Sequence, residues 1–184
     1  NYLRFNVFRP EQPEAVLSAL ERINQSMPLV IDLRGNNGGS VAATLEIISR
    51  FTSQTLLAFS RVSRTDREAF FIEPPGPAYT GNTVILVDEM SISAAENFAA
   101  IMQKTGLATV MGVQTPGQLL WGEGFMLDDG SIAVIPVAQI IYPDESNLEG
   151  LGVTPDIVVP LDKQQLHQGT DSQLQRAIDF LSAR

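Results

Sequence analysis

Short apolar runs along the chain alternate with segments whose apolar residues recur at helical spacing, and this pattern predicts alternating strands and helices. Apolar or alternating runs predict strands at residues 2–8, 28–33, 55–60, 69–72, 84–87, 108–112, 124–127 and 132–142. Apolar residues three or four positions apart predict helices at residues 10–25, 42–51, 93–105 and 171–183. The prediction is an α/β layered fold, in which hairpins make the β-sheet mixed and helices flank it.

Composition narrows the possible functions. The chain has 184 residues, of which 44% are hydrophobic, and this fits one globular domain with a buried core. The net charge of −9 argues against nucleic acid as a partner, because phosphate binding needs a cationic face. The chain has no cysteine and a single histidine, so we expect no disulfide and no thiolate or histidine-rich metal site.

The chain begins inside a predicted strand and not at a methionine, so we expect a fragment or a mature domain. No apolar run has the length that a membrane-spanning helix needs. The cellular location therefore stays open, and an exported or periplasmic location is compatible with the sequence.

Ser93 lies where a predicted strand turns into a predicted helix. The apolar run at residues 84–87 precedes it, and an alanine-rich segment follows. Free N–H groups in the first turn of a helix favour negative charge, which suits a nucleophile that must generate an oxyanion. Alternatively, Ser93 only caps the helix, with Glu96 completing a capping box.

A glycine-rich turn at residues 35–39 follows the strand at 28–33. Its backbone N–H groups could face an anion, but the turn lacks the Gly-Lys-Ser/Thr ending of a phosphate loop and has no GxGxxG pattern. With Ser93 in view, we predict an oxyanion hole that uses Gly38 or Gly39. A purely structural turn is the alternative.

Charged residues next to these turns have plain structural explanations. Asp32 and Arg34 flank the glycine turn, and we expect them to brace it by ion pairing or hydrogen bonding and not to act as acid or base. Glu149 precedes a second Gly/Pro turn at residues 150–156, where a carboxylate is usually solvated. His167 lies in a polar stretch, and we predict a surface residue.

Four motifs in order along the chain resemble one family. They are Val30-Ile-Asp-Leu-Arg-Gly-Asn-Asn-Gly-Gly39, Ser91-Ile-Ser-Ala-Ala-Glu96, Gly112-x-x-Thr-x-Gly117 and Glu149-Gly-Leu-Gly-Val-Thr-Pro-Asp156. The chain resembles the tail-specific, or C-terminal processing, serine peptidases, which include the tricorn core protease and the interphotoreceptor retinoid-binding protein repeats. This resemblance implies a ClpP/crotonase-like fold for residues 1–184 as a single catalytic-core domain. A helical region and a PDZ domain commonly precede that domain.

The resemblance also assigns roles to residues. It places the nucleophile at Ser93, and the oxyanion donors at the backbone N–H of Ala94 and of a glycine in the Gly38–Gly39 pair. The Ser–Lys branch of the family has its lysine base at the position that Gln118 occupies here. A glutamine amide does not accept the serine proton near neutral pH, so this chain does not carry the Ser–Lys dyad.

In the tricorn-like branch, the base is a histidine from the region before the PDZ domain, and a glutamate joins it. Glu149 falls where that glutamate would be, whereas His167 does not match the histidine. Three explanations of the missing base stay open. The base lies on sequence outside this chain, the protein is a non-catalytic homologue, or a glutamine has replaced lysine at Gln118 by engineering.

The resemblance implies a serine endopeptidase core that cleaves polypeptides through an acyl-enzyme on Ser93. The isolated chain would be inactive, because no lysine or histidine base is in place. The alternative is an inactive homologue that binds peptides or an apolar ligand, as the retinoid-binding relatives do. Acyl-CoA chemistry on the related crotonase fold is disfavoured by the peptidase motifs. The resemblance implies a polypeptide as partner and no metal or organic cofactor. Whether the protein forms a homo-oligomer stays open.

Overall fold

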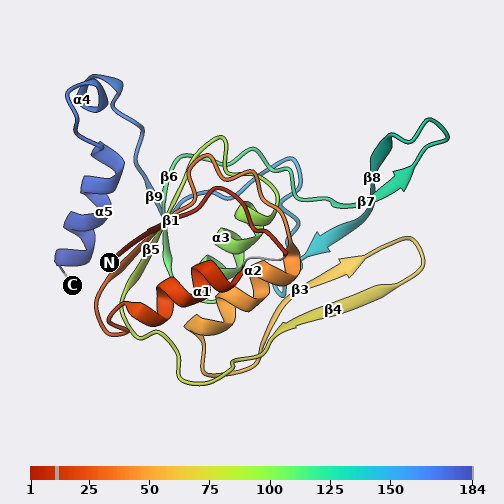
Figure 1. Ribbon diagram of the computed structural model, residues 1–184, viewed down its shortest axis with the longest axis horizontal. Helices are drawn as coiled ribbons and strands as arrows, with labels where there is room; N and C mark the ends of the chain where they lie inside the picture. Colours follow the sequence, from red (N-terminus) through yellow and green to blue (C-terminus); the bar gives the residue numbers. More distant parts are fainter. Residues whose placement is uncertain (11–12, 184) are drawn as a thin grey trace.

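Two β-sheets organise the chain in the computed structural model, which describes residues 1–10 and 13–183 (Figure 1). The first sheet has five parallel strands in the order β1-β2-β5-β6-β9. The second has four antiparallel strands in the order β4-β3-β8-β7. The predicted α/β fold with both strand directions is therefore confirmed, and each direction has its own sheet.

The strands of the parallel sheet are β1 (Tyr2–Arg4), β2 (Leu29–Asp32), β5 (Thr83–Val87), β6 (Thr109–Gly112) and β9 (Ile157–Val158). The strands of the antiparallel sheet are β3 (Leu56–Val62), β4 (Arg67–Ile72), β7 (Trp121–Met126) and β8 (Ile132–Ile141). The helices are α1 (Pro13–Arg22), α2 (Val41–Ile48), a 3-10 turn (Ser49–Phe51), α3 (Ala94–Lys104), α4 (Lys163–His167) and α5 (Ser172–Ser182). None of these described helices is both long and apolar enough to cross a membrane.

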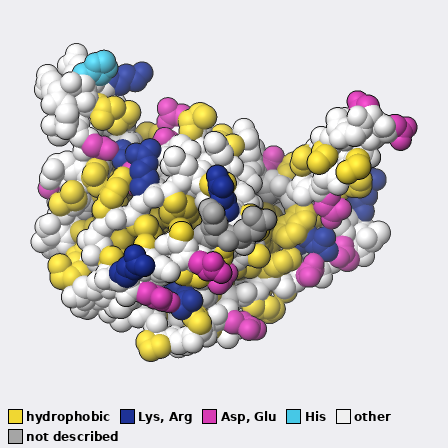
Figure 2. Space-filling model, in the orientation of Figure 1, with side chains coloured by type: hydrophobic (Ala, Val, Ile, Leu, Met, Phe, Trp, Pro, Cys, Tyr) yellow, Lys and Arg dark blue, Asp and Glu magenta, His cyan; other side chains and the backbone are white. Residues whose placement is uncertain are grey.

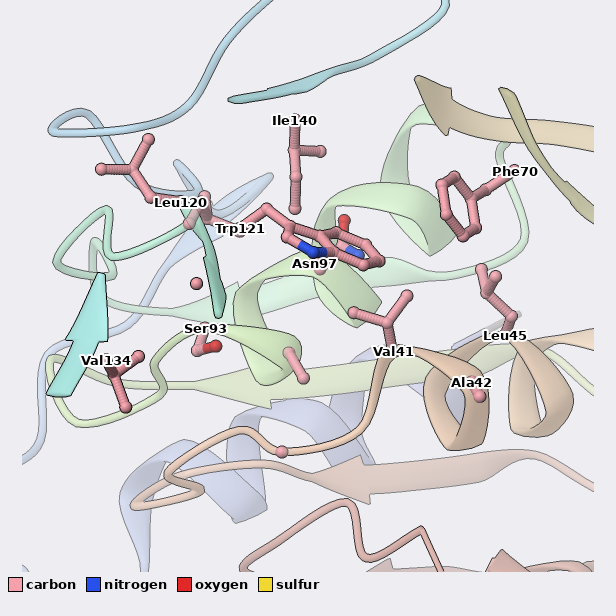
Figure 3. A pocket seen from close by; sticks show the side chains of 14 residues that line it. Val41, Ala42, Leu45, Phe70, Ser93, Asn97, Leu120, Trp121, Val134 and Ile140 are labelled. Carbon is pink, nitrogen blue, oxygen red and sulfur yellow. The ribbon is translucent and has the colours of Figure 1, made fainter. Parts of the chain in front are cut away.

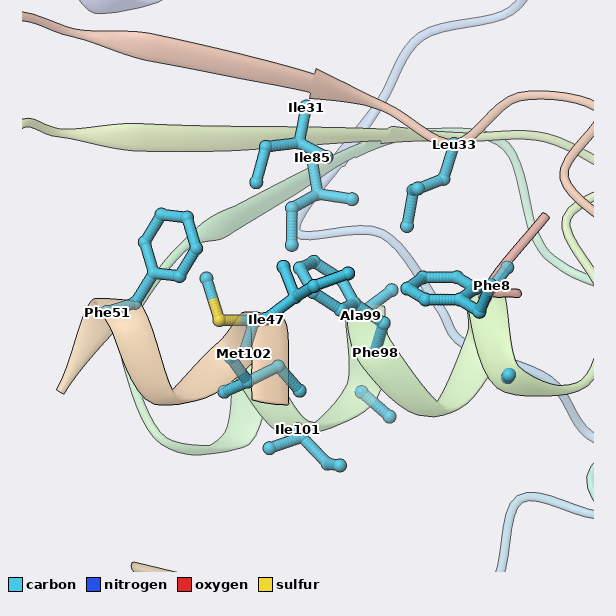
Figure 4. Packing of buried hydrophobic residues seen from close by; sticks show 14 of the residues in the cluster. Phe8, Ile31, Leu33, Ile47, Phe51, Ile85, Phe98, Ala99, Ile101 and Met102 are labelled. Atoms are coloured by element: carbon cyan, nitrogen blue, oxygen red, sulfur yellow. The ribbon is translucent and has the colours of Figure 1, made fainter. Parts of the chain in front are cut away.

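The central strand β5 is buried along its whole length, because helices cover both faces of the parallel sheet. Alternate side chains of a strand point to opposite faces. Val84 and Leu86 pack with the inner side of α5, whereas Ile85 and Val87 belong to the larger core with α2 and α3. Figure 4 shows Ile85 facing the side chains of those two helices. The long apolar run therefore marks the centre of the fold.

The antiparallel sheet extends away from this core. Its two hairpins, β3–β4 and β7–β8, project to one side of the molecule, and α4 and α5 lie on the opposite side (Figure 1). Strand β8 joins the hairpins by pairing with β3 as well as with β7. The face of this sheet near α2 and α3 forms one wall of the pocket described below.

The predicted elements differ from the structure mainly at their ends. The predicted strand at 2–8 is only Tyr2–Arg4, because the chain then leaves the sheet and Phe8 forms a bridge with Gly39 instead. The predicted helix at 10–25 corresponds to Pro13–Arg22, and residues 11–12 lie outside the described part.

Two elements were absent from the prediction. Strand β9 pairs with β6 at the sheet edge, and α4 is a single short helix. Elements of two and five residues are too short to show a period, so hydrophobic patterning does not find them.

The predicted Asp32–Arg34 brace is confirmed. The Arg34 guanidinium donates to both carboxylate oxygens of Asp32, at 2.8 and 2.6 Å, and to both oxygens of Asp171, at 2.9 and 2.7 Å. Asp171 also caps α5 by accepting from the Leu174 N–H. One side chain thus ties the end of β2 to the start of α5.

This ion cluster makes stability depend on pH. Burial raises the pKa of Asp32, but hydrogen bonds from Arg34 and from the Tyr2 hydroxyl outweigh it and leave the pKa below its ordinary value. The hydrogen bond from Arg34 likewise lowers the pKa of Asp171. Both carboxylates therefore stabilise the fold above their unfolded pKa of about 4, and this contribution is lost as pH falls through the lower folded values.

We expect Arg34→Met to lower the free energy of unfolding at pH 7 by about 3–5 kcal/mol, because it removes the close, buried partner of Asp32 and leaves the half-exposed Arg4, at 3.7 Å, as its counter-ion. The acid-dependent loss of stability below about pH 4 should also become smaller than in the wild type. Urea unfolding from pH 3 to pH 7 measures both effects. Arg22→Met, an exposed change on α1, is the matched control, and equal losses in the two variants would contradict the brace.

Candidate active site

Ser93 occupies a strained turn between β5 and α3. Its φ is 57° and its ψ is −118°, a conformation that residues other than glycine rarely adopt. The side chain is half-buried and lines a pocket. Strained backbone at a strand-to-helix turn is typical of nucleophiles held out toward a substrate.

Glu96 joins this turn to a distant loop. The side chain is fully buried, and its carboxylate accepts four hydrogen bonds. Oε2 accepts from the N–H groups of Ser93, at 3.0 Å, and Gln118, at 2.8 Å. Oε1 accepts from the Thr115 hydroxyl, at 2.6 Å, and the Gly117 N–H, at 2.7 Å. Ser93 and Gln118 therefore lie against the same oxygen atom.

The glycine turn packs directly on Ser93. A Cβ on Gly38 would lie 2.7 Å from the Ser93 Cβ and 2.9 Å from the Ala94 nitrogen, so only glycine fits there. The Gly38 N–H donates to Asn36 Oδ1 at 2.9 Å. Within the described residues, the N–H groups of Gly39 and Ala94 have no acceptor, and both residues line the pocket with Ser93. Two free donors thus accompany the hydroxyl.

Glu149 approaches the same loop from the second Gly/Pro turn. Its Oε2 accepts from the Leu119 N–H at 2.6 Å, and the carboxylate is half-buried. The neighbouring Gly150 N–H donates to the carbonyl of Gly117 at 2.8 Å. The Gln118 side chain is exposed. Ser93, Gln118 and Glu149 are therefore brought into one region through the loop at residues 115–119.

No lysine or histidine is among the described residues that line the pocket. Lys104 lies at the far end of α3, where its Nζ bonds to Asp144 at 2.7 Å. His167 is exposed on α4, as predicted, and Figure 2 shows it at the opposite end of the molecule from the β7–β8 hairpin. In the described part of the chain, no group of three His, Cys, Asp or Glu residues could hold a metal ion.

The pocket beside Ser93 has a volume of about 630 Å³ and mostly apolar walls (Figure 3). Val41 and Leu45 of α2 form one side, whereas Phe70, Trp121 and Ile140 come from the antiparallel sheet. The aromatic rings of Phe70 and Trp121 lie 5.3 Å apart. A pocket of this size and polarity can take apolar side chains of a bound chain.

A hydroxyl at the start of a helix with free N–H donors beside it is typical of a serine hydrolase. Comparison with known proteins gives the particular family. The family model described as "Peptidase family S41" matches residues 1–159. The chain belongs to this family of serine peptidases, whose substrates are polypeptides.

Individual relatives agree with this assignment. The chain is 29% identical over 186 residues to a carboxyl-terminal-processing protease of Picosynechococcus sp.. The match covers 98% of this chain and 45% of that protein. The chain thus spans under half the length of the curated relatives that it matches. In fold, it resembles a putative S41 protease from Bacteroides fragilis, with a TM-score of 0.83 at 17% identity over 99% of this chain and 54% of the other. It also resembles the tricorn protease, with a TM-score of 0.78 at 21% identity over 98% and 17% of the two chains.

The sequence predicted one of the four hydrogen bonds that Glu96 accepts. The Ser93–Glu96 contact belongs to the predicted capping box, but the three bonds to residues 115–118 were missed. One signal was present in the sequence, since an ionisable residue within an alanine-rich apolar helix needs buried partners.

We expect Glu96→Gln to lower the free energy of unfolding by roughly 3 kcal/mol, because the amide group of glutamine opposes N–H donors where the carboxylate accepted them. Amide exchange at Gly117 and Gln118 should accelerate as the loop loosens. Urea unfolding and hydrogen exchange measure the two effects. Glu89→Gln, an exposed change, is the control, and unchanged exchange in Glu96→Gln would contradict the linking role.

We expect Gln118→Lys to confer peptide hydrolysis on this chain, because the N–H groups of residue 118 and of Ser93 bond to the same Glu96 oxygen, so the backbone that carries the lysine lies near the serine. A gain of about 10²-fold or more over the wild-type chain is expected for a positioned base, measured with a fluorogenic peptide mixture.

Two controls make the Gln118→Lys result specific. Gln118→Arg should remain inactive, because arginine keeps its proton. The double variant Gln118→Lys, Ser93→Ala should also be inactive. A folded Gln118→Lys protein with no gain would contradict the expectation that a lysine at position 118 reaches Ser93.

Proposed function

We propose that Ser93 is the nucleophile of a serine endopeptidase that acts through an acyl-enzyme. The single observation that carries the proposal is the strained Ser93 with the free N–H groups of Gly39 and Ala94 beside it. Gly39 and Ala94 line the same pocket as Ser93, so their N–H groups would stabilise the carbonyl oxygen that becomes negative when Ser93 attacks. Because the Gly38 N–H is bonded to Asn36, we assign Gly39 as the glycine donor.

The reaction follows from this arrangement. Ser93 Oγ adds to the scissile carbonyl carbon as its proton passes to a base, and the oxyanion accepts hydrogen bonds from Gly39 and Ala94. The intermediate then expels the amine, which takes up the proton, and leaves an ester on Ser93. Water adds to that ester with the help of the same base and releases the new carboxylate.

We propose that the base comes from outside the 184 residues, with these residues acting as the catalytic core of a longer peptidase. The absence of a lysine or histidine from the described pocket lining supports this. Glu149, anchored to the Leu119 N–H, would orient or polarise that base. As in the relatives named for carboxyl-terminal processing, the whole protein would cleave polypeptides near their C-termini.

We expect the full-length protein to shorten an unfolded polypeptide, and Ser93→Ala to abolish this, by on the order of 10⁶ in kcat. Mass spectrometry of the products identifies the bonds cleaved. Ser182→Ala, an exposed change on α5, should leave cleavage unchanged. The 184-residue chain alone should not cleave. Ser93-dependent cleavage by the isolated chain would contradict the external base, and none by the full-length protein would contradict the peptidase.

Binding without catalysis is the second candidate function. Two features favour it: the pocket is largely apolar, and position 118 holds an exposed glutamine. A homologue without catalysis could use the same pocket to bind a peptide or an apolar ligand. A histidine encoded upstream of residue 1 in the full-length gene would favour the enzyme, whereas its absence would favour the binding protein.

A further inference from the structure

Asn97 is a buried polar residue in the lining of the pocket, and one group of its side-chain amide has no hydrogen-bond partner among the described residues. It follows Ser93 by about one turn of α3 and lines the same cavity, as Figure 3 shows. The residue is 1% exposed. Its Oδ1 accepts from the Tyr142 hydroxyl at 2.9 Å, but its buried Nδ2 has no partner among the described residues.

Tyr142 fixes which end of the amide is free. Its hydroxyl is buried, and burial, followed by the negative charges of Glu96 and Asp144, raises its pKa far above the ordinary value. The phenol therefore keeps its proton and needs an acceptor, which Asn97 Oδ1 supplies. Reversing the amide would leave both this proton and Oδ1 unpaired, so the unpaired group is the Nδ2 donor.

An unpaired buried amide is destabilising by about 1–3 kcal/mol, and native proteins rarely leave one. A bound ligand with an acceptor oxygen would remove that penalty. The ligand group should carry no negative charge, because the pocket lining contains no lysine or arginine and Glu96 already places a buried carboxylate beside it. The surrounding walls suit an apolar stem that leads to the acceptor.

We propose that Asn97 is a specificity-determining residue whose Nδ2 donates to an uncharged acceptor on the substrate side chain next to the attacked carbonyl. Glutamine is the side chain of this kind, with an apolar stem and a terminal amide oxygen. This proposal rests on the proposed peptidase function. It predicts a preference for glutamine over both glutamate, which brings charge, and leucine, which leaves the Asn97 amide unpaired.

The test measures kcat/KM of the full-length protein on peptides that differ only at the residue carrying the attacked carbonyl, as glutamine, glutamate or leucine. Glutamine should be preferred. Asn97→Leu should lower the glutamine-to-leucine ratio of kcat/KM by about 10–100-fold. An unchanged ratio, or no glutamine preference in the wild type, would overturn the proposal.

A binding measurement separates this proposal from the catalytic one and does not depend on folding of the Asn97 variant. Full-length Ser93→Ala should bind the glutamine peptide more tightly than the leucine and glutamate peptides in calorimetry. Equal affinities would overturn the role of Asn97 even if the wild type cleaves. If the glutamine peptide binds most tightly but the wild type cleaves nothing, the result would support Asn97 as a donor to glutamine and would refute the peptidase function.

Discussion

The buried carboxylate of Glu96 is the constraint on which the candidate site depends. A carboxylate that has left water must find donors, and here all four come from backbone and side-chain groups of two segments far apart in sequence. Satisfying Glu96 therefore fixes the Ser93 turn against the loop at 115–118. That loop in turn packs on the Gly150–Gly152 turn, where a Cβ on Gly152 would collide with the Thr115 carbonyl oxygen.

The main helices and strands could be predicted from the sequence, because buried residues produce the apolar patterns that mark them. The strand 84–87, helix 93–105 and the two hairpins were all found, and the apolar run of β5 marked the centre of the parallel sheet. The family motifs led to Ser93. The positive φ of Ser93 and the long-range bonds of Glu96 were missed. A glutamate in an apolar helix signals that it needs buried partners, but the sequence does not show which distant groups supply them. Strand β9 is held by its pairing with β6, which no local pattern encodes.

The proposed site has N–H donors for a developing oxyanion. The described residues that line the pocket include no lysine or histidine that could take the serine proton. Ser93, Gly39 and Ala94 all belong to two turns of this chain, so the proposed nucleophile and oxyanion donors lie within these residues and the proposed base does not. Gln118 stands at the position that resembles the lysine position of the Ser–Lys branch. Its backbone N–H shares the Glu96 oxygen with that of Ser93, but its side-chain amide does not take a proton. Membership of peptidase family S41 identifies the chain as a serine peptidase homologue. Whether this member hydrolyses peptide bonds depends on a base that can take the Ser93 proton. The Asn97 donor would then decide which side chains reach Ser93 productively.

The most direct test of the account is labelling of the full-length protein with a fluorophosphonate, followed by peptide mapping of the modified residue. Such a reagent reacts with a serine that a base has activated. The account predicts a single label on Ser93, lost in Ser93→Ala and absent from the isolated 184-residue chain. A folded full-length protein that stays unlabelled, or that carries its label on another serine, would contradict it.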